Sequence, residues 1–240
     1  TNKITKLPQK EIISGTKKLM VGRSINDYWL REWYGVDPTD GAALYYNNTG
    51  ASGFRVLPKG DTVATNPTNA RFGYAGTAIP DAYGAFNFSF RYRNLTLSSL
   101  MNWQLGGLTY DDTYAAYMHS GTYGASMHKD MLLRWKAPGD ITNVPRADNA
   151  QTSFFGAASS RWLTDASFLN IQNITLVYDF KGRFGKKTLP FQSGRLFLAV
   201  ENVQMFTNRN GMNPMQSFSG VTSVGYIPAR VINLGINVNL

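Results

Sequence analysis

Apolar and polar residues alternate from Phe86 to Tyr92, where aromatic residues at even positions are separated by asparagine, serine and arginine. Because successive side chains of a strand point to opposite faces, this period of two predicts a strand with one apolar and one polar face. A second alternating run covers Leu95–Gln104, and Asn94 between the runs suits a tight turn. Residues 84–109 are therefore predicted to form a long hairpin.

Three further runs have the same period: Phe168–Phe180, Arg195–Phe206 and Arg230–Leu240, although the first is irregular in its early half and the second is mixed on both faces. Soluble strands average about 5–6 residues, whereas a tilted strand that crosses a bilayer needs about 9–11. The length of these runs favours a membrane barrel over a soluble sandwich.

The connections between the expected strands alternate in length. Those at 37–41 and near 94 are tight and that at 181–193 is moderate, whereas those at 47–83, 110–165 and 207–227 are long and rich in Gly, Asn and Ser. Short turns on one side and long loops on the other are typical of outer-membrane barrels, in which the long loops face the cell exterior. The expected strands are 18–36, 41–46, 84–93, 95–109, 166–180, 194–206 and 228–240.

Seven strands cannot close a bacterial single-chain barrel, because the strand number of such barrels is even. Seven strands would also leave two open edges in lipid, where unpaired backbone groups are not tolerated. The predicted fold is therefore all-β: an antiparallel transmembrane β-barrel, of which this chain supplies about seven C-terminal strands with long extracellular loops. The last strand is expected to pair with a first strand that lies outside this chain.

Composition narrows the function further. The 240 residues contain no cysteine, which excludes disulfides, thiolate metal sites and cysteine nucleophiles. The formal net charge is +9, but lysine and arginine are scattered and form no aromatic-lined stripe, so nucleic acid is not an expected partner. The sequence has no apolar run long enough for a transmembrane helix and its first residues are not a signal peptide, so any export signal would lie upstream.

Several blocks of the sequence resemble one family in combination. They are GRSINDYWLREWYGVDPTDG (22–41), DAYGAFNFSFRYRNLTLSSLMNWQLGGLTYDDTY (81–114), HKDMLLRWKAPGDITNVPR (128–146), RWLTDASFLNIQNITLVYDF (161–180) and RLFLAVENVQMFTNRNGMNP (195–214). Together they resemble the SusC/RagA-type TonB-dependent transporters of the Bacteroidetes outer membrane. Two departures stand out: the chain ends in Leu240, where the family commonly has an aromatic residue, and Asn170 and Gln172 occupy positions that often carry Arg or Lys.

The resemblance implies a 22-stranded barrel with a plugged lumen, in which residues 1–240 match the C-terminal part. The plug domain and the N-terminal barrel strands would be absent from this chain. It implies active import of oligosaccharides or peptides across the outer membrane, without catalysis or a cofactor. The implied partners are a SusD-like surface lipoprotein, TonB–ExbB–ExbD through the missing N-terminal part, the rest of the barrel and plug, and outer-membrane lipid with lipopolysaccharide.

No constellation of residues matches a nucleophile elbow, a P-loop, an HExxH motif or an EF-hand, and no catalytic residue is assigned. His119 and His128 lie in one expected loop and are candidates for metal ligation or base catalysis, with plain solvent exposure as the alternative. Asp111 and Asp112 are either a carboxylate pair for Ca²⁺ or simply the start of a loop. No metal site is assigned to either group.

The aromatic residues are predicted to have different roles in the loops and in the strands. Those in the expected loops are candidates for contact with a ligand or with a lid, or for packing against other loops: Trp135, Phe154, Phe155, Trp162 and Phe218. A second group is predicted to form the aromatic girdles at the membrane interfaces: Tyr28, Trp29, Trp33, Tyr34 and Trp103.

The alternation assigns a direction to the strand residues. The residues expected to face the lumen or the plug are Arg91, Arg93, Asn233 and Asn237, and pairing of the arginines with plug carboxylates is the first expectation. The residues expected to face lipid are Phe86, Phe88, Phe90, Ile232, Leu234, Ile236, Val238 and Leu240.

Three functions compete. The leading hypothesis is nutrient import: ligand capture outside, occlusion, and TonB-driven release into the periplasm. The first alternative is a structural or scaffold barrel that serves surface assembly or secretion without substrate uptake. The second is a soluble carbohydrate-binding sandwich, against which the strand lengths and the loop asymmetry argue.

Overall fold

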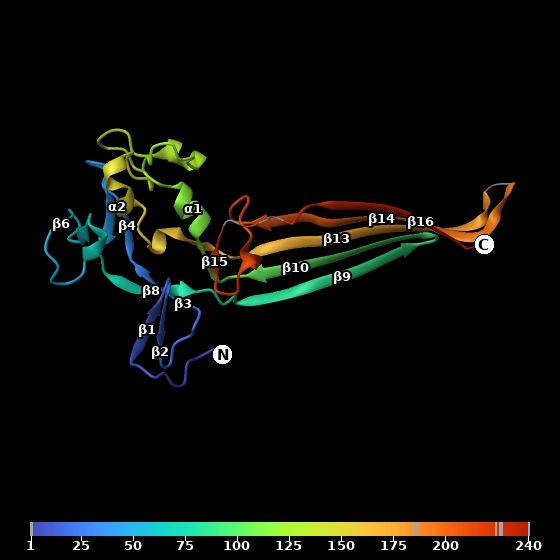
Figure 1. Cartoon of the computed structure of the whole chain (residues 1–240), viewed down its shortest axis with the longest axis horizontal. Helices are drawn as coiled ribbons and strands as arrows, with labels where there is room; N and C mark the ends of the chain where they lie inside the picture. The colour runs from blue at the N-terminus through green and yellow to red at the C-terminus, as the bar shows by residue number, and fades with distance from the viewer. Residues whose placement is uncertain (1, 185–186, 224, 226–227, 240) are drawn as a thin grey trace. The chain divides into compact units, whose positions relative to one another are not determined.

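The computed structural model describes residues 2–184, 187–223, 225 and 228–239, without the side chains of residues 182–191. The fold is all-β, with antiparallel sheets and a few short helices (Figure 1). The chain divides into two units. Thr1–Ile79, Gly107–Asp165 and Met215–Val224 form the short-strand unit, and Pro80–Gly106, Ala166–Pro214 and Gly225–Leu240 form the long-strand unit. None of the described helices has both the length and the hydropathy needed to span a membrane.

The long-strand unit is one antiparallel sheet in the order β16-β14-β13-β10-β9. Figure 1 shows these five strands side by side as long ribbons. They are β9 (Ala82–Tyr92), β10 (Leu95–Leu105), β13 (Phe168–Phe184), β14 (Lys187–Thr207) and β16 (Val231–Asn239). The five periodic runs of the sequence thus correspond to the five strands of this sheet.

The predicted hairpin over 84–109 is present, with a two-residue turn. Tyr92 pairs with Leu95, and Arg93 in the turn has a φ of 55°. The second strand ends earlier than predicted, because Gly106 and Gly107 have φ values of 72° and 75° that a strand cannot continue through.

The connection predicted at 181–193 is much shorter in the structure. β13 and β14 pair as far as Phe184 opposite Lys187, so the described residues of this segment belong to a long hairpin rather than to a separate loop. Gly185 and Lys186 lie outside the described residues. Backbone pairing with a neighbouring strand overrides the low strand propensity of Gly and Lys here.

β13 and β14 each contain an irregularity near Gln172. The register between β10 and β13 shifts after Leu100, so Gln172 is an extra residue in β13 relative to β10. Between β13 and β14, Asn202 and Val203 of β14 lie opposite the single residue Gln172. A bulge of this kind reverses which residues point to a given face. It explains why the apolar positions are odd before Gln172 and even after it.

The short-strand unit contains three sheets: β1-β2-β3-β8, β4-β5-β7-β6 and β12-β11-β15. Its strands are β1 (Glu11–Ser14), β2 (Lys17–Met20), β3 (Asp27–Arg31), β4 (Trp33–Val36), β5 (Ala43–Tyr46), β6 (Phe54–Val56), β7 (Thr62–Ala64), β8 (Phe72–Thr77), β11 (Leu108–Asp111), β12 (Leu163–Asp165) and β15 (Val221–Thr222). Its two α-helices are α1 (Asp112–Tyr117) and α2 (Thr152–Phe155). Single 3-10 turns occur in the chain at η1 (Pro67–Asn69), η2 (Lys129–Leu133), η3 (Asn149–Gln151), η4 (Ser160–Trp162) and η5 (Pro214–Gln216).

Two of the seven predicted strands do not join the long sheet. Residues 18–36 form parts of β2, β3 and β4, and residues 41–46 form β5, all within the short-strand unit. β3 pairs with β8, which comes from the connection expected to be a loop over 47–83. The count of about seven long strands is therefore corrected to five, because this partner divides the N-terminal segment into short strands.

The cores of the short-strand unit hold the large aromatic residues. One cluster gathers Tyr28, Leu30, Tyr110, Met118, Met131, Val144 and Trp162, and a second gathers Ala42, Ala43, Tyr45, Ala70 and Phe155. The hydroxyl of Tyr28 donates to the backbone oxygens of Leu108 at 3.0 Å and Gly220 at 2.5 Å. Burial raises the pKa of Tyr110 to about 12 and raises the pKa of Tyr28, so both hydroxyls stay neutral.

The assignment of Tyr28 to an interfacial girdle is therefore wrong, because its side chain is fully buried. Trp29 lies against Phe72 and Tyr74, and Trp33 lies against Tyr45. Tyr34 contacts Tyr46 edge to face. These four aromatic residues pack within the short-strand unit, and only Trp103 of the predicted girdle lies in the long sheet.

Candidate functional site

One face of the long sheet is a continuous apolar surface. Directly paired residues on neighbouring strands point to the same face, so the register defines complete rows across all five strands. One row consists of Phe90, Leu97, Leu176, Leu198 and Leu234. The next row consists of Tyr92, Leu95, Tyr178, Leu196 and Ile236. Every side chain in these two rows is at least 36% exposed.

The residues predicted to face lipid lie on this surface. Phe86, Phe88 and Phe90 alternate along β9, and Ile232, Leu234, Ile236 and Val238 alternate along β16, all on the face defined by the rows above. Leu240 lies outside the described residues. The register therefore places two distant alternating segments on one surface.

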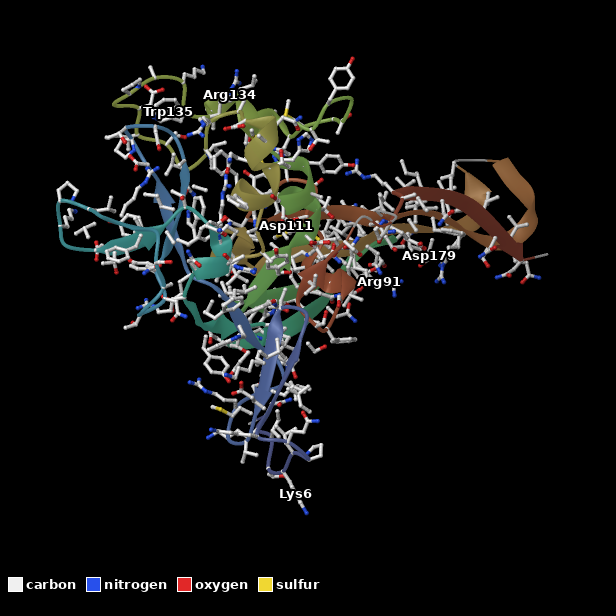
Figure 2. The ribbon with its side chains drawn as sticks, turned by 60° about the vertical axis from the view of Figure 1, so that its left-hand side comes forward. Lys6, Arg91, Asp111, Arg134, Trp135 and Asp179 are labelled. Carbon is white, nitrogen blue, oxygen red and sulfur yellow. The ribbon has the colours of Figure 1, made fainter. Side chains whose placement is uncertain are left out.

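The opposite face is mostly polar and carries three of the four residues predicted to face the lumen, Arg91, Asn233 and Asn237. Asn233 is paired with Ala199, and Asn237 with Arg195, which in turn is paired with Asp179. The side chain of Arg195 donates to Asp179 at 2.8 Å. Arg91 lies on this face of β9, and Figure 2 labels Arg91 and Asp179 on the long strands.

A polar hollow of about 590 Å³ opens among these groups. Arg91, Lys181 and Arg195 supply three cations, and Asp179 supplies the carboxylate among the lining residues. The remaining lining residues are Asn94, Phe180, Ser193, Gly194, Asn237 and Asn239. The excess of cations gives the hollow an electrostatic preference for acidic groups. Arg93, by contrast, lies in the turn, and its guanidinium is 5.3 Å from the ring of Tyr92.

Three glycines of the sheet are covered by aromatic rings of the paired strand. Gly84 is opposite Trp103, Gly194 is opposite Phe180, and Gly235 is opposite Phe197. A Cβ added at any of these glycines would overlap the facing ring. Gly235 thus accommodates a side chain from the neighbouring strand.

The apolar face has its own hollow, of about 620 Å³, near one end of the strands. Phe86, Trp103, Leu169 and Phe206 contribute apolar walls, and Trp103 stacks on Phe86 with the ring centroids 6.0 Å apart. The indole nitrogen of Trp103 has no hydrogen-bond partner among the described residues. An indole on an apolar surface suits the membrane interface, where such rings concentrate.

The aromatic residues proposed as ligand contacts are dispersed. Trp162 and Phe155 are core residues, exposed by 1% and 3%, so the prediction that they contact a ligand directly is corrected by their burial. Phe154 is half-buried and its carbonyl oxygen accepts from the hydroxyl of Tyr45 at 2.5 Å. Phe218 is fully exposed, and Trp135 is half-buried.

Trp135 is held by a loop whose polar groups are bonded locally. Its indole donates to the oxygen of Pro38 at 3.1 Å, and its ring covers Gly41. The carboxylate of Asp140 accepts from the backbone N–H groups of Lys136 at 2.9 Å and Ala137 at 3.0 Å, which hold the pKa of Asp140 below its ordinary value. Figure 2 shows Trp135 beside Arg134 in this unit. The side chain of Trp135 therefore connects this loop to the turn at 37–41, and Asp140 stabilises the loop itself.

The histidines and the aspartate pair occupy local structural positions. His119 accepts from the N–H of Thr122 at 3.1 Å, and His128 accepts from that of Asp130 at 3.1 Å. Asp111 is buried and caps α1 by accepting from the N–H of Tyr114 at 3.0 Å. Across the part of the chain that the structure describes, no three His, Cys, Asp or Glu side chains gather as metal ligands.

The chain is similar in sequence to two curated proteins of Formosa agariphila. It is 29% identical to TonB-dependent receptor P39 over 175 residues and 25% identical to TonB-dependent receptor P3 over 174 residues. Each match covers 68% of this chain but only 16% and 17% of the respective relative. No protein-family model matches the sequence.

The fold is similar to that of solved transporter structures. The RagAB peptide importer in its 'closed-closed' state matches with a TM-score of 0.77 and 20% identity, over 98% of this chain and 26% of the solved chain. The structure of the RagAB peptide transporter matches with a TM-score of 0.75 and 18% identity over the same shares. The 'open-open' state of the importer matches with a TM-score of 0.69 and 19% identity.

Reasoning from the sequence missed the ion pair between Asp179 and Arg195. Alternation puts Asp179 on the polar face, but the pairing of the two residues depends on the register between β13 and β14, which the sequence of one strand does not contain. The sequence also gave no sign that the N-terminal segment would pair with the expected loops.

Proposed function

We propose that this chain, which belongs to the SusC/RagA type of TonB-dependent transporters, supplies part of the barrel wall of an outer-membrane importer of oligosaccharides or peptides. The relatives are named TonB-dependent receptors, and the solved structures of similar fold are named a peptide transporter and a peptide importer. In the whole protein the function would be uptake of a nutrient ligand, with no chemical conversion.

The observation that carries this proposal is the two-faced long sheet. Its apolar rows extend unbroken across five strands, from Phe90 on β9 to Leu234 on β16. β9 and β10 each have 11 residues and β16 has 9, which agrees with the about 9–11 residues that a tilted strand needs to cross a bilayer. An exposed apolar surface of this extent is typical of contact with a membrane.

The polar face would then line the lumen or contact the plug. The cations around the polar hollow, Arg91, Lys181 and Arg195, fit acidic side chains of a plug domain, as Asp179 already illustrates within the sheet. Arg91 on the other face would cost roughly 2–4 kcal/mol at the midplane of the bilayer, which supports the assignment of the two faces.

The partners follow from the same proposal. A SusD-like surface lipoprotein would capture ligand outside, and TonB–ExbB–ExbD would supply energy through contacts with the whole protein. Nucleic acid has no place in this function.

Uptake tests the proposal directly. A strain that lacks the gene for the whole protein is expected to grow poorly on at least one glycan or peptide source, and the wild-type gene should restore growth. Complementation with a version unable to engage TonB serves as the control, because it should assemble in the membrane without restoring growth. Normal growth of the deletion strain on every source, with a loss of other surface proteins, would favour the scaffold function instead.

A further inference from the structure

The guanidinium of Arg161 in the short-strand unit lies against two indole rings. It lies 4.8 Å from the ring centroid of Trp33 and 4.4 Å from that of Trp162. Its Nη1 donates to the carbonyl oxygen of Phe155 at 3.2 Å. A guanidinium has five N–H donors. The other donors of Arg161 have no acceptor among the described residues, and each of them keeps some contact with solvent.

A second arginine shares this neighbourhood. Arg31 donates through Nε to the oxygen of Pro67 at 2.9 Å and through Nη1 to the oxygen of Ala158 at 3.3 Å. Both Arg31 and Arg161 act electrostatically on the hydroxyl of Tyr45, whose pKa burial raises and the two cations lower. Two guanidinium groups therefore lie close enough to one phenol to affect its ionisation.

Neither arginine forms an ion pair with a carboxylate of the described residues. Other arginines of the same unit do: Arg55 pairs with Asp37 at 2.7 Å, Arg71 pairs with Glu32, and Arg146 pairs with Asp148 at 2.9 Å. Burial lowers the pKa of Arg161 to about 10, because a buried cation without a counter-charge is costly. The local charge is thus unbalanced.

The segment that precedes Arg161 contains a buried hydroxyl without a hydrogen-bond partner. Ser159 is 0% exposed, and its Oγ has no hydrogen-bond partner among the described residues. Ser159 and Arg31 form a parallel bridge, which places their side chains on the same side of the backbone. A buried polar atom without a partner calls for an explanation, such as a group that is bound there when the protein functions.

We propose that Arg161, Arg31 and Ser159 form a binding site for an oxyanion, the carboxylate or sulfate group of the imported ligand. The fork of a guanidinium suits bidentate contact with such a group, and the hydroxyl of Ser159 is an additional donor. The indole of Trp33, which also donates to Asn143 at 2.9 Å, offers an aromatic surface next to the charge. The inference rests on the proposed import function and narrows its substrates to acidic ligands.

Binding to the whole transporter, purified in detergent with its surface lipoprotein, tests the site. Isothermal titration would compare pentaalanine that has a free carboxylate with its C-terminal amide, trigalacturonate with its methyl ester, and sodium sulfate with sodium chloride. At least one acidic probe is expected to bind about tenfold more tightly than its neutral counterpart, since a hydrogen bond to a charged group contributes more than a neutral one. The probe that shows the preference identifies the carboxylate or sulfate source.

Three variants locate the effect. Arg161→Gln is expected to abolish the preference for the acidic probe while leaving the affinity for the neutral probe unchanged, and Ser159→Ala should reduce the preference several-fold without affecting folding. Arg71→Gln is the matched control, because Arg71 also lies on an aromatic ring, that of Tyr46, but is already paired with Glu32. It should retain the full preference for the acidic probe.

Equal binding of acidic and neutral probes by the wild type would overturn the site, as would an unchanged preference in both Arg161→Gln and Ser159→Ala. If no acidic probe binds and Arg161→Gln lowers the thermal midpoint, the counter-charge comes from another part of the transporter and the inference is wrong. In either case, ligand-dependent growth can persist, so a failure of the oxyanion site is distinguishable from a failure of the import function.

Discussion

The two units use the same kinds of side chain in opposite ways. In the short-strand unit the aromatic residues are interior: Tyr45 is 0% exposed and Trp162 is 1% exposed. In the long-strand unit the apolar residues are on the surface: Phe90 is 64% exposed and Leu234 is 73% exposed. One unit hides its apolar groups from water within itself, whereas the other has them on its surface, which under the proposed function faces lipid.

The difference shows that burial within the chain is not the only way that an apolar pattern is satisfied. The long sheet is described as one layer of five strands, so under the proposed function its stability in a membrane depends on strand pairing and lipid contact. The short-strand unit depends on packing of its own cores. Substitution of a large apolar residue should therefore affect stability for different reasons in the two units: loss of core packing in the short-strand unit and loss of lipid contact in the long-strand unit.

The largest effect is expected at the core of the short-strand unit. Trp162→Ala should lower the free energy of unfolding of this unit by about 3–5 kcal/mol, because it leaves a cavity among tightly packed residues. The urea dependence of proteolysis within this unit, in the whole transporter, would measure the change. Phe218→Ala is the control, since a fully exposed side chain should leave the midpoint unchanged. Equal effects of the two variants would contradict the assigned core.

A charge on the apolar face should have the next largest effect. Leu234→Arg is expected to destabilise the inserted barrel by about 2–4 kcal/mol, because the guanidinium would face lipid near the middle of the strand. Asn233→Arg, one residue earlier on the polar face, should cost far less. Refolding of the whole transporter into vesicles, followed by urea titration, measures both. A larger cost for the Asn233 variant would reverse the assignment of the faces.

Packing across the sheet predicts a smaller effect. Gly235→Ala should destabilise the long sheet by about 1–3 kcal/mol, because the new Cβ would overlap the ring of Phe197 on the neighbouring strand. The same substitution in a Phe197→Leu background should cost less, and this double-mutant cycle isolates the contact. Additive effects in the vesicle-based urea titration would indicate that the ring does not cover Gly235 in the membrane.

The smallest predicted effect concerns Lys17, in the short-strand unit. Burial lowers the pKa of Lys17 to about 8, while its ammonium lies 3.2 Å from the ring centroid of Tyr28 and donates to Asn26 at 2.8 Å. Between pH 8 and about 10.5 the unfolded chain holds a proton that the folded chain has lost, so this group's contribution to stability rises with pH.

The measurement is the difference in urea midpoint between pH 7.5 and pH 10. The wild type should gain more stability, or lose less, than Lys17→Met, by under about 1 kcal/mol because the group is partly exposed. Lys18→Met is the control, since Lys18 is the next residue of the same strand and is paired with Glu11. An identical pH response of wild type and Lys17→Met would disprove the predicted contribution of Lys17.

The alternation of the sequence was sufficient to predict the long strands because each of them has to satisfy two different environments. The runs at 86–92 and 231–239 retain their period without interruption. Gln172 broke the pattern of β13 because a bulge depends on the backbone bonds of two neighbouring strands, a property that one strand's sequence does not contain.

The candidate site was predictable only where it depends on this alternation. Arg91, Asn233 and Asn237 are on the polar face, as expected, but the pairing of Asp179 with Arg195 required the register. In the short-strand unit the alternation of apolar and polar residues did not predict the core, because the residues around Trp162 come from segments far apart in the sequence. Loop aromatics therefore looked available to a ligand although some of them form the core.

The central claim is that the two faces of the long sheet meet different solvents, and spin labels test it most directly. The chain has no cysteine, so Leu234→Cys and Asn233→Cys each create a single labelling position within it. In the whole transporter in lipid, the label at position 234 should collide more with molecular oxygen, which concentrates in the bilayer, and the label at position 233 should collide more with a water-soluble nickel chelate. A label at position 234 that is quenched mainly by the nickel chelate would contradict the account.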